Sequence, residues 1–319
     1  MTATQRQRRR DPAVPAARPL SRRLAAWAQE RFPVALGAVM VPACLVALLY
    51  GRVLTHPGAP RPHLGDLAAV AAGWAFFLMV RIVDEHKDYE RDRAEYPGRV
   101  LQRGVVTLDQ LKVVAAGAVA LQLIVTLAAD GGIGRAGRWW ALALAWTALA
   151  AKDFFLGRWI ADRPVLYPLL HLPLSGLVCV WIAQLGAGPR SLPPAAFAVA
   201  ALGVTLSASV DLVRKFLPGT GGGRAYVRAL GVRRAATVGA VAVAVQTAVL
   251  ATLLRLADGP AAGVMALPVL AAGPQVALAR FAQAPTRRRG RAARAGMALL
   301  LPVQLAVSVA ALLAGPRGC

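Results

Sequence analysis

Long apolar segments alternate with short polar ones along almost the whole chain. The apolar segments are about 17 to 24 residues long, and a helix rising about 1.5 Å per residue needs roughly 20 residues to cross the hydrocarbon core of a bilayer. They show no period-two alternation, and they are longer than the roughly ten-residue strands of a membrane barrel. The pattern predicts an all-α polytopic membrane bundle of about nine transmembrane helices. The predicted spans are approximately 33–50, 66–83, 110–128, 139–156, 164–186, 193–210, 235–254, 261–279 and 296–315.

The same pattern divides the chain into two parts. Residues 1–32 form a basic N-terminal arm, and residues 33–319 form the membrane domain. The eighth predicted span contains two internal prolines, Pro268 and Pro274, a residue type that disfavours a regular helix.

Composition separates this chain from soluble enzymes and from disordered basic tails. Of 319 residues, 57% are hydrophobic and 16% are charged, yet 37 Lys and Arg stand against 15 Asp and Glu, a formal net charge of +22. A soluble domain has about 25% charged residues, and a disordered basic tail lacks the apolar content. The hydrophobic and basic residues must therefore occupy different segments of the chain.

The basic residues predict the orientation of the spans. If the N-terminus is cytoplasmic, 30 Lys and Arg fall on the inner side and 7 on the outer side, the asymmetry typical of a multi-pass protein with its N-terminus inside. We expect a cell-membrane protein whose basic arm contacts anionic lipid. Nucleic acid is not an expected partner, because the bases are divided among loops and no nucleic-acid module is visible. The Ala, Gly and Arg richness is typical of a GC-rich bacterial genome.

One segment departs from this basic pattern. Six of the fifteen acidic residues lie within residues 84–95. On a helix that turns 100° per residue, Asp84, Asp88 and Asp92 share one face, where like charges repel by a few tenths of a kcal/mol per pair. Aligned oxygen ligands suit Mg²⁺, which completes its coordination with water and substrate phosphate. The alternative is a solvated helix end with ion pairs to Lys87 and the neighbouring arginines.

A second stretch follows this acidic segment and gives it a family resemblance. Arg81 and the run from Asp84 to Arg93 are followed by Pro97-x-Arg99-x-Leu101-x-Arg103-Gly104. This combination resembles the first signature of the UbiA-type intramembrane prenyltransferase superfamily, an N/D-x-x-x-D-x-x-x-D run followed by an R-P-L-P-R-G-like stretch. The predicted spans and cytoplasmic N-terminus are similar to the family's architecture, so the resemblance covers nearly the whole chain.

The resemblance implies a substrate and a reaction. Family members bind an isoprenyl diphosphate through Mg²⁺, ionise its allylic C–O bond, and let a lipophilic acceptor capture the carbocation. By position, Asp84, Asp88 and Asp92 would be the metal carboxylates and catalytic residues. Arg81, Arg99 and Arg103 would contact the diphosphate or anchor the loop.

The family's second acidic motif is incomplete here. Asp211-x-x-Arg214-Lys215 resembles an E-x-x-R-K run, and Tyr226 matches a tyrosine further on. The aspartate expected just before that tyrosine is absent, and Arg224 lies near its position. We expect Asp211, Arg214, Lys215 and Arg224 to contact the diphosphate, with the basic side chains substituting for a second metal.

Lys152 ends the fourth predicted span near the position of a functional basic residue in many family members. A catalytic role is one interpretation of Lys152, and positive-inside anchoring is the other.

The resemblance favours a prenyltransferase acting on an aromatic or other lipophilic acceptor. Two alternatives stay open: a UbiA-type terpene cyclase, and a non-catalytic family member.

Overall fold

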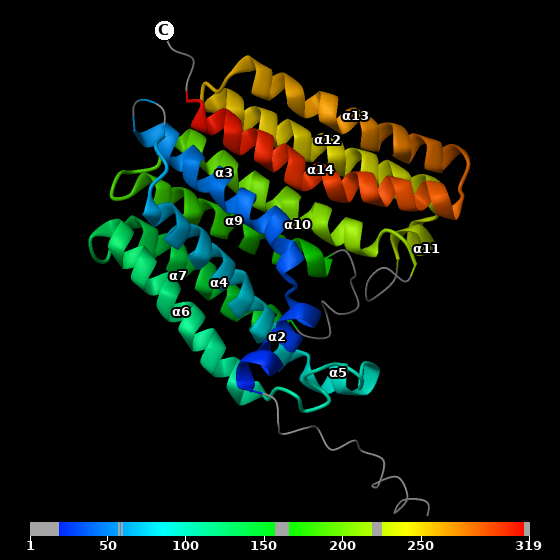
Figure 1. The fold of residues 1–319 in the computed structure, drawn as a ribbon, viewed down its shortest axis with the longest axis horizontal. Helices are drawn as coiled ribbons and strands as arrows, with labels where there is room; N and C mark the ends of the chain where they lie inside the picture. Colours follow the sequence, from blue (N-terminus) through cyan, green and yellow to red (C-terminus); the bar gives the residue numbers. More distant parts are fainter. Residues whose placement is uncertain (1–18, 57, 59, 157–165, 219–224, 316–319) are drawn as a thin grey trace, which may run out of the picture. The chain divides into compact units, whose positions relative to one another are not determined.

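A computed structural model describes residues 19–56, 58, 60–156, 166–218 and 225–315. Within these residues all regular structure is helical, as predicted (Figure 1). The helices are α2 (Leu20–Arg31), η1 (Val34–Leu36), α3 (Gly37–Thr55), α4 (Leu64–Lys87), α5 (Tyr89–Glu95), α6 (Leu108–Asp130), α7 (Arg135–Ala151), η2 (Asp153–Phe155), α9 (Leu166–Ala187), η3 (Pro194–Ala198), α10 (Val199–Lys215), α11 (Tyr226–Leu230), α12 (Val232–Leu256), α13 (Ala261–Gln283) and α14 (Arg287–Leu313).

Each of the nine predicted spans coincides with a helix. Eight helices in the described part of the chain are long and apolar enough to cross a membrane, judged by length and composition. The fourth predicted span is α7, which has 17 residues and lies at the short end of the range for a spanning helix. The eighth is α13, which contains both Pro268 and Pro274. Membrane helices tolerate internal proline because neighbouring groups satisfy the freed backbone carbonyls.

The described chain forms two compact units. The first contains residues 19–36 and 76–120, and the second contains the described residues of 37–75 and 121–315. Helices α4 and α6 each contribute one part to each unit. In the first unit, Trp27 of α2 is buried with Ile82 of α4, Leu101 and Val106 of the following loop, and Leu111 of α6. This small apolar core joins the end of the N-terminal arm to the segment that carries the acidic cluster.

The second unit is built on close helix contacts. Helix α9 packs against α3, α7 and α10, while α12, α13 and α14 pack against one another. Glycine permits two of these contacts, because a Cβ at Gly186 of α9 would lie 2.0 Å from the carbonyl oxygen of Leu48, and one at Gly203 of α10 would lie 2.1 Å from that of Ser175. Small residues at helix crossings allow backbones to approach in this way.

Two groups of buried polar side chains in the second unit bond across helices. Gln304 of α14 donates to the hydroxyl of Thr247 on α12 at 2.8 Å and to the carbonyl of Leu267 on α13 at 3.1 Å. Arg52 of α3 forms an ion pair with Asp66 of α4. These bonds satisfy groups that would be costly to leave unpaired in an apolar environment.

The α3–α9 contact leads to a stability prediction. We expect Gly186→Ala to lower the free energy of unfolding by about 1–3 kcal/mol, the usual cost of overpacking, because the new methyl group meets backbone that cannot rotate away. Gly273→Ala in α13 is the control, since a Cβ there has no neighbour within 4 Å. The two variants are compared by thermal unfolding in detergent, and equal midpoints would contradict the prediction.

Candidate active site

The first signature lies where the chain turns out of α4. Asp88 separates α4 from α5 with φ −95° and ψ 6°, in the sparsely occupied bridge region. Backbone hydrogen bonding continues through the bend, because the amide of Asp88 donates to the carbonyl of Asp84 at 2.9 Å and that of Asp92 to the carbonyl of Asp88 at 2.8 Å. The aspartates therefore follow one another turn by turn, but the expectation of one uninterrupted helix through them is wrong.

The three aspartates have different environments. The Asp84 side chain is 46% exposed and lies 3.7 Å from Arg81. The Asp88 side chain is 25% exposed and pairs with Arg91 at 3.0 Å. The Asp92 side chain is only 7% exposed, and the guanidinium groups of Arg31 and Arg99 both bind its Oδ2. Solvent access thus decreases along the signature.

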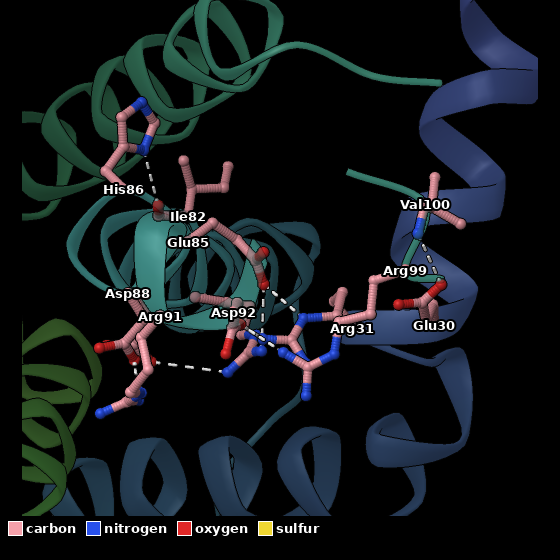
Figure 2. Close-up of polar contacts among 12 residues, drawn as sticks. Glu30, Arg31, Ile82, Glu85, His86, Asp88, Arg91, Asp92, Arg99 and Val100 are labelled. Atoms are coloured by element: carbon pink, nitrogen blue, oxygen red, sulfur yellow. Dashed lines mark hydrogen bonds and ion pairs between the residues drawn. The ribbon is translucent and has the colours of Figure 1, made fainter. Parts of the chain in front are cut away.

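Glu85 is the most deeply buried acid of this segment, at 1% exposure. Its Oε1 accepts from Nε of Arg31 at 2.5 Å and pairs with Nη2 of Arg81 at 3.0 Å. Arg31 also donates from Nη2 to Asp92 at 3.3 Å. Figure 2 shows the Arg31 side chain reaching from α2 toward both carboxylates. Three arginines, Arg31, Arg81 and Arg99, therefore balance the buried charges of Glu85 and Asp92.

The loop after α5 belongs to the same network. The guanidinium of Arg99 lies 3.7 Å from the ring centroid of Tyr96 while it binds Asp92. The amide of Val100 donates to Glu30 of α2 at 3.0 Å, as Figure 2 shows. Arg103 is exposed. Of the three arginines predicted to contact the diphosphate or anchor the loop, Arg81 and Arg99 bind carboxylates, and Arg103 lies on the surface.

The donor chemistry of this cluster suits a divalent cation. Both arginines on Asp92 bind Oδ2, so neither occupies Oδ1, and the buried Oε2 of Glu85 has no hydrogen-bond partner among the described residues. Carboxylate oxygens are the ligands that Mg²⁺ prefers. The described residues contain no group of three His, Cys, Asp or Glu side chains arranged to hold a metal. The metal role of the three aspartates stays a prediction.

The second signature lies in the other compact unit and forms its own cluster. Asp211, near the end of α10, pairs with Nζ of Lys215 at 2.8 Å and accepts from the hydroxyl of Tyr226 on α11 at 3.1 Å. The sequence match of Asp211, Lys215 and Tyr226 therefore corresponds to direct contacts. Arg294 of α14 donates to the carbonyl of Val213 at 2.9 Å and connects α14 to the same end of α10.

Burial raises the pKa of the Tyr226 hydroxyl to about 12, and the neighbouring Asp211 charge and their hydrogen bond act in the same direction. The phenol therefore stays protonated at neutral pH and donates a hydrogen bond to Asp211. Lys215 and Tyr226 together satisfy the only carboxylate of this signature.

The remaining predicted residues are less involved in contacts. Arg214 is exposed beside Lys215. Lys152 is exposed at the C-terminus of α7 and precedes three residues, 153–155, with φ from 47° to 58°, a left-handed run that is unusual outside glycine. Arg224 lies outside the described residues.

Sequence reasoning did not select Arg31 or Glu85. Arg31 is 54 residues from Glu85 and counted only as one of the bases of the N-terminal arm. Glu85 had a local signal, since Arg81 precedes it by four residues on the same helix, a spacing at which side chains meet. No local pattern connects Arg31 with either acid.

Comparisons with known proteins agree with the resemblance at the level of fold. No family model and no curated protein sequence matches the chain. A digeranylgeranylglyceryl phosphate synthase aligns at a TM-score of 0.60 and 13% identity, over 92% of this chain and 99% of that one. A UbiA homolog from Archaeoglobus fulgidus aligns at 0.50 and 13% identity, over 91% and 99%. The chain has the UbiA-type fold.

A structure of a UbiA homolog from the same organism, bound to DMAPP and Mg²⁺, aligns at a TM-score of 0.48 and 12% identity, over 91% of this chain and 99% of that one. Those ligands are properties of that protein. The alignments at TM-scores of 0.60 and 0.50 confirm the predicted UbiA-like helical bundle for this chain.

The Glu85 network gives a stability prediction. Glu85→Gln removes the negative charge that faces Arg31 and Arg81, and breaking a buried pair from one side costs about 3–5 kcal/mol. We expect a loss of that order in chemical denaturation of the purified protein. Glu90→Gln, which neutralises an exposed acid on the next turn, is the control. A Glu85→Gln variant as stable as this control would show that the network contributes no stability.

Tyr226 gives a prediction about pH. A pKa raised from 10.0 to about 12 means that the folded state binds this proton more tightly than the unfolded state. The stability from Tyr226 is present below pH 10 and is lost as pH rises through 12. In a spectrophotometric titration, we expect the difference between wild type and Tyr226→Phe to show a phenol with a midpoint near 12. A midpoint near 10 would mean that the hydroxyl is solvated and not bound to Asp211.

Proposed function

We propose that this protein is an intramembrane prenyltransferase that moves an isoprenyl group from its diphosphate to a lipophilic acceptor. The observation that carries the proposal is the combination of the UbiA-type fold with the acid–arginine cluster at the end of an apolar helix, α4. The aligned protein is a digeranylgeranylglyceryl phosphate synthase in membranes, which agrees with a lipid-soluble substrate. An aromatic acceptor is one candidate within this class.

In this proposal the residues of the first signature have distinct tasks. Asp84 and Asp88, the more exposed aspartates, and Asp92 through its second oxygen would hold Mg²⁺. The bound ion would stabilise the charge that develops on the leaving diphosphate. Arg103 would bind diphosphate oxygens. The bases of the second signature, Arg214, Lys215 and Arg224, are proposed to bind diphosphate by the same chemistry. Arg81 and Arg99 keep the carboxylates oriented through the contacts described above.

The apolar helices supply the remaining requirement. An allylic cation reacts with water, so the isoprenyl chain must be surrounded by hydrocarbon while the diphosphate stays at the polar end. The eight long apolar helices in the described part of the chain provide such surroundings. The polar signature at the end of α4 provides the site of ionisation.

The test measures ionisation separately from transfer. The purified protein in liposomes is incubated with Mg²⁺ and isoprenyl diphosphates of several lengths, with and without a quinol or phenol acceptor, and both diphosphate release and products are quantified. A prenylated acceptor supports the proposal. Cyclic hydrocarbon formed without acceptor would instead identify a terpene cyclase, and no diphosphate release at any length would leave a non-catalytic protein.

Substitutions test the assigned aspartates. We expect Asp84→Ala, Asp88→Ala and Asp92→Ala each to lower the rate of diphosphate release by about 100-fold or more, the usual cost of removing one preorganised electrostatic contact to the transition state. Asp109→Ala is the control, because that side chain is 87% exposed and outside the signature. Unchanged ionisation in both the Asp88 and Asp92 variants would overturn the metal assignment.

A further inference from the structure

Arg31 contacts both sides of the bend at Asp88. Its Nε binds Glu85 on α4, and its Nη2 binds Asp92 on α5. Arg81 binds acids on the α4 side, Asp84 and Glu85, while Arg99 binds Asp92 on the α5 side. Among these three arginines, Arg31 is the one whose contacts span the bend (Figure 2).

Arg31 also extends from a firmly packed helix. Trp27, one turn before it on α2, is 2% exposed and packs against Ile82 and Leu101. Glu30, the preceding residue, accepts from the amide of Val100 in the loop after α5. The position of Arg31 is therefore set by contacts that do not involve its own guanidinium.

We propose that Arg31 is a positioning residue that fixes the orientation of α5 relative to α4, and thereby the placement of Asp92 relative to Asp84 and Asp88. Helix α5 has only seven residues. Without a contact that spans the bend, α5 could rotate about Asp88 and carry the Asp92 carboxylate with it. Arg31 removes that freedom because one rigid, planar guanidinium joins both segments. Its consequence for catalysis rests on the proposed function, whereas the contact itself does not.

The proposal requires the shape of arginine in addition to its charge. A lysine ammonium is a compact point charge on a flexible stem and lacks the planar fork that holds two carboxylates at once. Arg31→Lys should therefore keep the network's net charge and still loosen α5. Arg22→Gln is the matched control, because Arg22 is an exposed base on the same helix.

The first experiment measures the contact without any substrate. Hydrogen–deuterium exchange of the full-length protein follows peptides covering 88–96, which contain the hydrogen-bonded amides of Asp92 and Tyr96. We expect exchange there to be at least tenfold faster in Arg31→Gln and Arg31→Lys than in wild type, and unchanged in Arg22→Gln. Equal exchange in the Arg31 and Arg22 variants would overturn the proposal.

The second experiment measures the effect on the metal site. Binding of a non-ionisable isoprenyl thiodiphosphate, of the chain length that wild type ionises, is titrated with Mg²⁺. We expect the half-saturating Mg²⁺ concentration to rise at least fivefold in Arg31→Lys, with the unfolding midpoint above the assay temperature. An unchanged Mg²⁺ dependence beside faster exchange would overturn the positioning role.

The two experiments separate this inference from the proposed function. If wild type neither ionises nor binds any isoprenyl diphosphate, the proposed function fails, while the exchange measurement still decides whether Arg31 holds α5.

Discussion

A buried carboxylate at the end of an apolar helix must be matched by positive charge. Glu85, at the end of α4, therefore requires cationic side chains beside it. Its side chain is 1% exposed, and an unpaired charge there would cost several kcal/mol. Arg81 supplies one partner from the same helix, and Arg31 supplies the other from α2. The N-terminal helix, the bend at Asp88 and the loop with Arg99 are therefore parts of one electrostatic assembly.

This assembly also accounts for the arginine content of the first signature. Guanidinium groups that bind carboxylates allow several acids to lie close together before any cation is present, since each pair reduces the repulsion between neighbouring acids. Because these arginines bind carboxylates, their guanidinium groups are not available to another anion. Under the proposed function, a diphosphate would be bound by other bases, such as exposed Arg103.

The second signature has a single carboxylate, and its partners differ from those of the first. Its carboxylate, Asp211, is held by one lysine and one protonated phenol. Tyr226 holds its proton because burial disfavours the phenolate. Residues 207–228 contain four bases and one acid, whereas residues 81–103 contain six of each, so the second signature has the larger net positive charge.

Much of the fold follows from the sequence alone. The length of the apolar segments and the absence of period-two alternation predicted nine spans, each of which coincides with a helix. Helix α13 contains Pro268 and Pro274, because in a membrane helix neighbouring groups can satisfy the backbone carbonyls that a proline leaves free. The aspartate run, the stretch from Pro97 to Gly104 and the predicted spans together indicated the UbiA-type fold, and the turn-by-turn order of the aspartates persists through the bend at Asp88. The contacts of Asp211 with Lys215, four residues away, followed the same local geometry.

The tertiary structure alone decided which acids are buried and which arginines hold them. Asp84, Asp88 and Asp92 are equivalent by spacing, yet only Asp92 is enclosed, because α2 and the loop at Arg99 pack over it. In the sequence, Arg31 cannot be distinguished from the other bases of the N-terminal arm. It reaches Glu85 only because Trp27, on the same helix, packs with Ile82. A local pattern determines where a helix forms and what it presents on each face. The pairing of charges 54 residues apart depends on how the chain packs, which no local pattern contains.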